Sequence, residues 1–257
     1  MKKSFSKIMK THISKFIYRS ALFLLCLIMY VVQRIINPNL VVRENIPLLV
    51  CFGLAWLLVL IDMIIRLFPT SSESMGCQKK YKKNYIEPEE KGDLKKSKTS
   101  PISVLLIALA WIGLNGLFGV LYFFKIFDQS ILMLIGLAYS ICDVICILFF
   151  CPFQTWFMKN KCCTTCRIYN WDYFMMCTPL IFVPNYRDMR LFDFIVLGLF
   201  LISILILAKW EITYAFKKER FVEATNDTLK CQNCKEKLCM HKPQLRRFLK
   251  RYRAKNK

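Results

Sequence analysis

Cysteine is the residue type in this sequence with the clearest potential for chemistry. The chain has 257 residues and 13 cysteines, and ten of the cysteines fall between Cys142 and Cys239. They form two groups in which the spacing resembles that of metal ligands. The first is Cys162-Cys163-x-x-Cys166, flanked by Cys151 and Cys177, and the second is Cys231-x-x-Cys234-x4-Cys239-x-His241.

The second group predicts a zinc site in the C-terminal tail. A Cys-x-x-Cys turn directs two thiolates at one centre, and a second pair of Cys or His side chains completes a tetrahedron. The surrounding segment is polar and has no core, so metal binding would supply most of its folding free energy. The alternative is a reduced tail without metal. The expected ligands are Cys231, Cys234, Cys239 and His241.

The first group has three interpretations that the spacing leaves open. An iron–sulfur cluster or a zinc ion is one of them, with Cys151, Cys162, Cys163 and Cys166 as ligands. A disulfide framework is the second, if this segment faces an oxidising compartment. In the third, the cysteines lie near the membrane and serve packing or palmitoylation.

Asp143 is a candidate functional residue of another kind, because it lies inside a long apolar run. A carboxylate at that depth in a bilayer costs about 3 kcal/mol on insertion scales, so it is retained for a reason. One reason is a functional site, such as a polar path for a transported solute. The other is a protonated carboxyl that hydrogen-bonds to Ser140, Asn115 or Tyr139.

Two more acidic residues have simpler expected roles. Asp62 and Arg66 are four residues apart near the end of an apolar run, where they predict a helical pair or a snorkelling end. Asp172 follows Asn170-Trp171 and is expected to cap a helix. The alternative is that its carboxylate hydrogen-bonds to a side chain that ligates a metal. Known catalytic motifs are missing, and the two histidines, His12 and His241, have no evident nucleophile partner. Whether the chain is an enzyme therefore stays open.

The elements that carry these residues are membrane-spanning helices. Apolar and aromatic residues make up 56% of the chain and the mean hydropathy is +0.37. The apolar runs are about 20 residues long, enough to cross roughly 30 Å of hydrocarbon. We predict an all-α, multi-pass integral membrane protein with five strong spans and a short, Pro-broken re-entrant or sixth segment. The spans are expected at 16–32, 47–68, 102–124, 130–150 (continuing to 158) and 191–214.

The charge of +21 lies in the segments between and after these runs. That pattern favours anionic lipid headgroups as the partner and disfavours nucleic acid. Five spans would place the basic N-terminus and the basic tail on opposite sides of the membrane, against the positive-inside rule. A sixth segment over 173–186, broken at Pro179 and Pro184, places both ends in the cytoplasm. On this interpretation we expect the Cys162–Cys166 group on the outer side.

The chain then divides into four parts. Residues 1–68 form an N-terminal hairpin of two spans, and 69–101 form a basic polar linker. Residues 102–214 form the C-terminal membrane bundle with a Cys-rich connector at 151–190. Residues 215–257 form the basic tail. Near its end the apolar residues recur at helical spacing, which predicts an amphipathic helix that binds an anionic membrane leaflet.

The favoured function is therefore a cell-membrane protein that binds metal through its cysteines and has a thiol-redox or electron-transfer role. The first alternative is a transporter or membrane-assembly component, in which the cysteines are structural and Asp143 lines a polar path. A scaffold that docks partners through its linker and tail is the third possibility.

Overall fold

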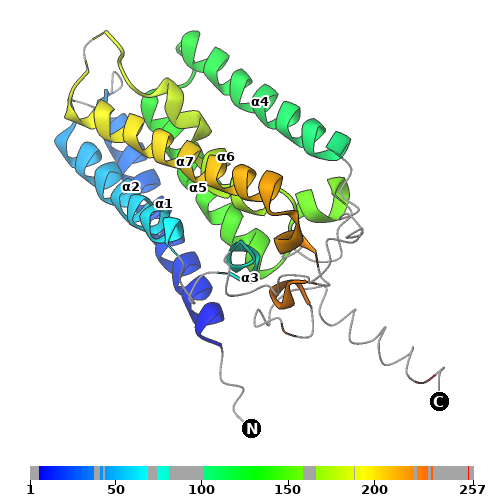
Figure 1. The fold of residues 1–257 in the computed structure, drawn as a ribbon. Coiled ribbons are helices and arrows are strands. Elements are labelled where there is room, and N and C mark those ends of the chain that lie inside the picture. The colour runs from blue at the N-terminus through cyan, green and yellow to red at the C-terminus, as the bar shows by residue number, and fades with distance from the viewer. Residues whose placement is uncertain are drawn as a thin grey trace.

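The computed structural model describes residues 6–37, 41–42, 44–68, 74–80, 101–158, 166–187, 189–222, 225–230, 233 and 254. Over these residues the fold is all-helical, as the sequence predicts. Five helices are long and apolar enough to cross a membrane. They are α1 (Lys7–Ile36), α2 (Ile46–Leu67), α4 (Pro101–Phe123), α5 (Gln129–Leu148) and α7 (Leu191–Phe216) (Figure 1).

The helix ends follow local capping. Ser6 accepts a hydrogen bond from the Met9 backbone N–H at 3.3 Å, so α1 begins at Lys7 and not at residue 16. Asn45 caps α2 in the same way, and Asp128 caps α5 by accepting from the Ile131 N–H at 2.9 Å. The last turn of α5 ends at Leu148, before Pro152, which has no N–H to continue it.

The tight part of the bundle is formed by α1, α2, α5, α6 (Asp172–Cys177) and α7. Its core includes Phe52, Trp56 and Met63 of α2, packed against α5 and α6. Gly136 of α5 makes room for Trp56, because an added Cβ there would lie 2.8 Å from the indole. This close approach joins the N-terminal hairpin to the later helices in one core.

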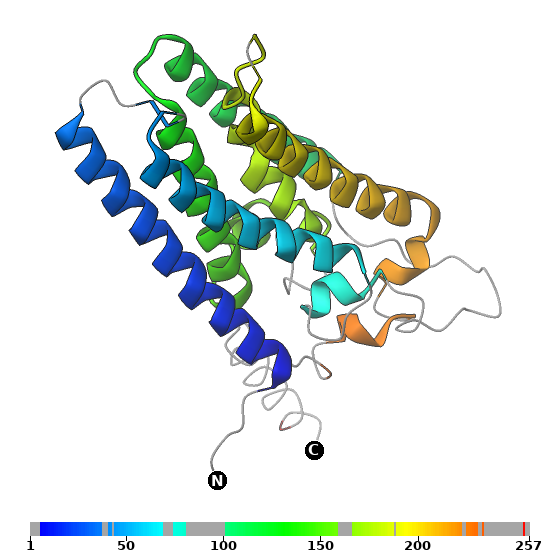
Figure 2. The ribbon, with the colours of Figure 1, turned by 90° about the vertical axis from the view of Figure 1, so that its left-hand side faces the viewer.

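A sixth segment runs between the two ends of the bundle. It consists of η4 (Tyr169–Trp171), α6 and η5 (Thr178–Phe182), one helical stretch of roughly 20–25 Å. Its start pairs Asp172 with Arg66 in the last turn of α2, and at its far end Val183 O accepts from the Gln129 side chain of α5. Figure 2 shows this segment inside the bundle, between α5 and α7.

This segment places the start of α1 and the end of α7 at the same end of the bundle (Figures 1 and 2). Lys209 near the end of α7 donates to the Leu67 carbonyl at the end of α2, which confirms the placement. The expected separation of the Cys162–Cys166 group from the N-terminal end of the bundle does not hold for Cys166, while Cys162 and Cys163 lie outside the described residues. Cys166 follows four candidate spanning helices and lies at the end of the bundle where α1 begins, and the Lys79 ammonium donates to the Cys166 carbonyl at 2.9 Å.

A compact polar layer closes this end of the bundle. It joins α3 (Met75–Gln78) to η6 (Lys218–Phe221) and η7 (Asp227–Leu229). Lys79 is 1% exposed, with its ammonium 4.8 Å from the Trp210 ring centroid, and Asn226 donates to the Lys79 carbonyl at 3.0 Å. The start of the linker and the start of the tail are therefore bound to each other.

In contrast, α4 lies at the edge of the bundle (Figure 1). It packs mainly against η5 and against η2 (Phe153–Phe157), a single π-helical turn. Its buried side chains are Ile107 and Asn115, while most of the others are exposed. Such a helix leaves room on its inner side, and the candidate site is found there.

Candidate functional site

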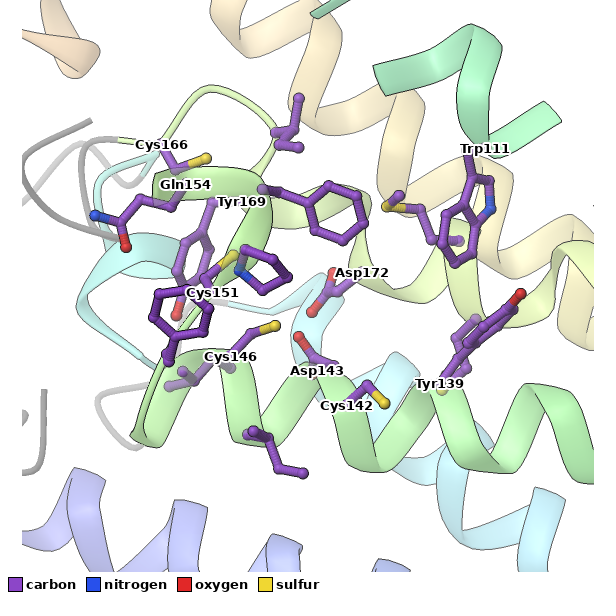
Figure 3. Close-up of a pocket in the computed structure, with 18 residues that line it drawn as sticks. Trp111, Tyr139, Cys142, Asp143, Cys146, Cys151, Gln154, Cys166, Tyr169 and Asp172 are labelled. Atoms are coloured by element: carbon purple, nitrogen blue, oxygen red, sulfur yellow. The ribbon is translucent and has the colours of Figure 1, made fainter. Parts of the chain in front are cut away.

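A cavity of about 450 Å³ lies between α4, α5, η2 and the segment from Cys166 to Met176 (Figure 3). Its wall is mostly apolar and aromatic. Trp111 of α4 packs against Tyr139 of α5 with 4.7 Å between ring centroids, and against Phe153 at 6.3 Å. The Trp111 indole N–H donates to the Thr178 hydroxyl at 3.3 Å, which fixes the ring against the sixth segment.

Four cysteines line this cavity: Cys142, Cys146, Cys151 and Cys166. Cys142 and Cys146 are one turn apart on α5, while Cys151 follows the break after this helix. Hydrogen bonding between the Cys146 and Cys151 side chains lowers the Cys151 pKa, and burial of the thiol opposes this shift. The backbone N–H groups of Phe153 and Gln154 also donate to this sulfur and act in the same direction.

Two carboxylates form the polar part of the cavity wall. Asp143 lies one turn before Cys146 on α5, and Asp172 is the first residue of α6. Figure 3 shows the two carboxylates facing each other inside the cavity. The Asp172 side chain is 6% exposed, and its Oδ1 atom lacks a hydrogen-bond partner among the described residues. An unsatisfied buried oxygen of this kind is available to a ligand.

Behind Asp143 lies a buried charged network that α1 supplies. Arg19 donates from Nη2 to Asp62 Oδ2 at 2.9 Å and from Nη1 to the Ser140 carbonyl at 2.9 Å. The distance from Arg19 Nη1 to Asp143 Oδ2 is 3.6 Å. Lys15 adds a 3.1 Å pair to Asp62, so that one carboxylate of α2 holds two cations of α1. Buried charges need such partners to offset the cost of desolvation.

Asp172 is held in a similar way. Arg66 Nη1 lies 2.6 Å from Asp172 Oδ2 and donates to Asn170 Oδ1 at 3.1 Å, and its guanidinium lies 4.5 Å from the Tyr173 ring centroid. Asp172 therefore does not cap the helix: Trp171 occupies the N-cap, and the carboxylate pairs with α2. Asp62 and Arg66 are also both buried and do not form a snorkelling end.

The structure brings some of the predicted site residues together. Cys151, Cys166 and Asp143 line one cavity, although they are distant in sequence. Among the residues that the structure describes, no three His, Cys, Asp or Glu side chains form a group able to hold a metal ion. Six predicted ligands lie outside the described residues, so both metal sites stay predictions. They are Cys162, Cys163, Cys231, Cys234, Cys239 and His241.

The sequence reasoning missed the contribution of α1. Lys15 precedes the expected first span and Arg19 lies inside it, and neither was given a role, yet both are buried at 8% and 3% exposure. A signal was present, since His12, Lys15, Arg19 and Cys26 recur at helical spacing and form one buried stripe. Cys146 was missed as a partner of Cys151, because the turn that brings them together is not visible in a spacing of five residues.

Comparison of the chain with protein-family models, with curated proteins and with solved structures finds no match. The function is therefore inferred from the chemistry of the cavity.

Proposed function

We propose that this multi-pass membrane protein is a thiol–disulfide oxidoreductase whose reactive pair is Cys146 and Cys151. The observation that carries the proposal is the placement of Cys146 and Cys151 together in the wall of one cavity, where their side chains interact. Cys151 also accepts backbone N–H groups from the turn that begins at Phe153. A second thiol within reach of a stabilised thiolate is the arrangement that exchange chemistry requires.

The reaction balances as a two-electron exchange with a substrate disulfide. The Cys151 thiolate attacks one sulfur of the substrate, which forms a mixed disulfide and releases the first substrate thiolate. Cys146 then loses its proton and attacks the Cys151 sulfur. The Cys146–Cys151 disulfide forms, the mixed disulfide breaks, and the second substrate thiolate leaves. The substrate is reduced to two thiols, and the reverse sequence oxidises a dithiol.

Trapping the mixed disulfide tests this proposal. The Cys146→Ser variant cannot resolve the adduct, so incubation with a disulfide-containing peptide should leave that peptide attached to Cys151, as mass spectrometry would detect. Cys26→Ser is the matched control, and it should release the peptide as the parent protein does. An adduct spread evenly over the other cysteines, with none favoured, would reject Cys151 as the nucleophile.

A transporter with a polar path at Asp143 is the second candidate. Its support is that Asp143 lies inside the cavity and 3.6 Å from a guanidinium of α1, so that its state is coupled to helix packing. Asp143→Asn should then abolish solute movement in proteoliposomes but leave thiol exchange intact. Loss of exchange with unchanged solute movement would decide for the oxidoreductase.

Zinc in the tail, an iron–sulfur cluster near Cys151–Cys166 and contact with anionic headgroups are further proposals. The support for the tail site is its ligand spacing alone. The support for the lipid contact is the basic composition of the linker and the tail, and the placement of residues 74–80 and 217–222 at one end of the bundle. We propose the cytoplasm for that end of the bundle, because the basic segments attach there. Metal analysis of anaerobically purified protein, before and after removal of residues 231–257, tests the tail site.

A further inference from the structure

We infer that the cavity binds a lipid-soluble quinone, which exchanges two electrons and two protons with the Cys146–Cys151 pair. This inference rests on the proposed function and names the carrier that would regenerate the pair. It draws on the access to the cavity, on its aromatic wall and on its two carboxylates.

The access to the cavity is from the side of the bundle. The cavity wall includes Cys142 and Ile145 of α5, which are both exposed. The neighbouring surface of α4 is formed by exposed apolar side chains such as Leu105, Leu109 and Ile112. In a bilayer these surfaces face acyl chains, so a ligand dissolved in the membrane reaches the cavity without crossing water.

The interior suits a flat ring with an apolar substituent. The volume of about 450 Å³ falls within the range of roughly 300–1,000 Å³ that small-molecule sites occupy. Trp111, Tyr139 and Phe153 form one aromatic wall, where an offset or edge-on ring would pack. Polar groups are few in this wall, which disfavours a hydrophilic substrate.

The carboxylates supply polar groups that can hydrogen-bond to the oxygens of the ring. Asp143 and Asp172 are the two carboxylates in the cavity wall, and an arginine lies beside each of them. Asp172 Oδ1 has no hydrogen-bond partner among the described residues, and Asp143 lies one turn from Cys146. Asp172 Oδ1 can therefore accept a hydrogen bond from a quinol hydroxyl.

The overall step balances without a further reactant. Two S–H bonds of Cys146 and Cys151 break, and one S–S bond forms between the two sulfurs. The two electrons and two protons reduce the quinone, and two O–H bonds form at its oxygens. Running the step in reverse uses a quinol to reduce the disulfide.

The test uses the full chain in lipid nanodiscs, reduced with dithiothreitol and then freed of it. Decylubiquinone is the probe, because its ring carbons are all substituted and thiols cannot add to them. We expect saturable quenching of tryptophan fluorescence that Trp111→Phe removes. We also expect one quinol formed for each Cys146–Cys151 disulfide. Cys146→Ser and Cys151→Ser should still bind the quinone but reduce it at least 100-fold more slowly, while Cys26→Ser matches the parent protein.

Two results would overturn the inference. One is the absence of saturable quenching in protein that still exchanges with disulfide peptides, which rejects the quinone but leaves the proposed function standing. The other is reduction by Cys146→Ser/Cys151→Ser at the parent rate, which assigns the electrons to other thiols. Loss of peptide exchange is measured separately, so a failure of the proposed function is seen directly.

Discussion

Among the residues that the structure describes, two pairs of neighbouring cysteines lie in different surroundings. Cys26 of α1 and Cys51 of α2 have sulfurs 3.4 Å apart in the tightly packed half of the molecule, at 0% and 9% exposure. Cys146 and Cys151 lie in the open half, beside α4, at the wall of the cavity. Close sulfurs alone therefore do not define a redox site.

The difference lies in what surrounds each pair. The Cys26–Cys51 pair is enclosed by core side chains of the largest apolar cluster, where a thiolate would be poorly solvated. Cys151 lies outside the spanning helices, at the start of a π-helical turn whose backbone N–H groups donate to its sulfur. We expect reactivity in the second pair and structural packing in the first. The following predictions are ordered from the largest effect to the smallest.

The largest effect is expected on exchange activity. Cys151→Ser removes the nucleophile and should lower the rate of exchange with a disulfide peptide by about 1,000-fold. Cys26→Ser removes a sulfur of the packed pair and should leave that rate unchanged. The measurement is the initial rate of peptide reduction by reduced protein in nanodiscs. Equal losses in the two variants would remove the distinction between the pairs.

The charged groups behind the cavity give the next effect. Arg66→Met leaves Asp172 buried without its cation, which should cost about 3–5 kcal/mol of unfolding free energy. Arg34→Met is the matched control, because the Arg34 side chain is 46% exposed and lies 3.9 Å from Asp128. Its loss should cost at most about 1 kcal/mol. Unfolding in mixed detergent micelles measures both, and similar costs would show that the Arg66 pair does not support the cavity.

The tightly packed half around α2 and α5 and the open half beside α4 should respond differently to an added methyl group. Gly136→Ala places a Cβ 2.8 Å from the Trp56 ring and should destabilise the tight half by about 1–3 kcal/mol. Gly113→Ala on α4 meets nothing within 4 Å and should be neutral or stabilising by up to about 1 kcal/mol. The same micelle unfolding assay applies. A destabilised Gly113→Ala would indicate that another group packs against this exposed face of α4.

The smallest effect concerns the pH dependence of alkylation. The hydrogen bond from Cys146 holds the Cys151 pKa below its ordinary value, so more thiolate persists as the pH falls. Alkylation of Cys151 by iodoacetamide at pH 7 should be about tenfold faster in the parent protein than in Cys146→Ala. Peptide mapping measures the rate at each cysteine. A rate that is unchanged in Cys146→Ala would mean that the neighbouring thiol does not stabilise the thiolate.

The sequence was sufficient to predict the helices but not the cavity. Each candidate spanning helix contains a long, predominantly apolar window, so its position depends on local composition, and the short sixth segment was suggested by Pro179 and Pro184. The cavity depends on tertiary placement. Cys166 reaches Cys151 because the chain turns back after α5, and Asp172 reaches Asp143 because Arg66 of another helix holds it. Neither of these two proximities could be predicted from the spacing of the residues in the sequence.

The short sixth segment also has a consequence for biosynthesis. At roughly 20–25 Å it is shorter than a hydrocarbon core of about 30 Å, and it begins with a carboxylate. Such a segment gains too little free energy from partitioning to enter the bilayer alone. It is expected to enter with α7 as a hairpin, after α2 has brought Arg66 to the position where Asp172 needs a cation. Maturation of the cavity would then be the last event in membrane insertion, completed only when α7 has left the ribosome.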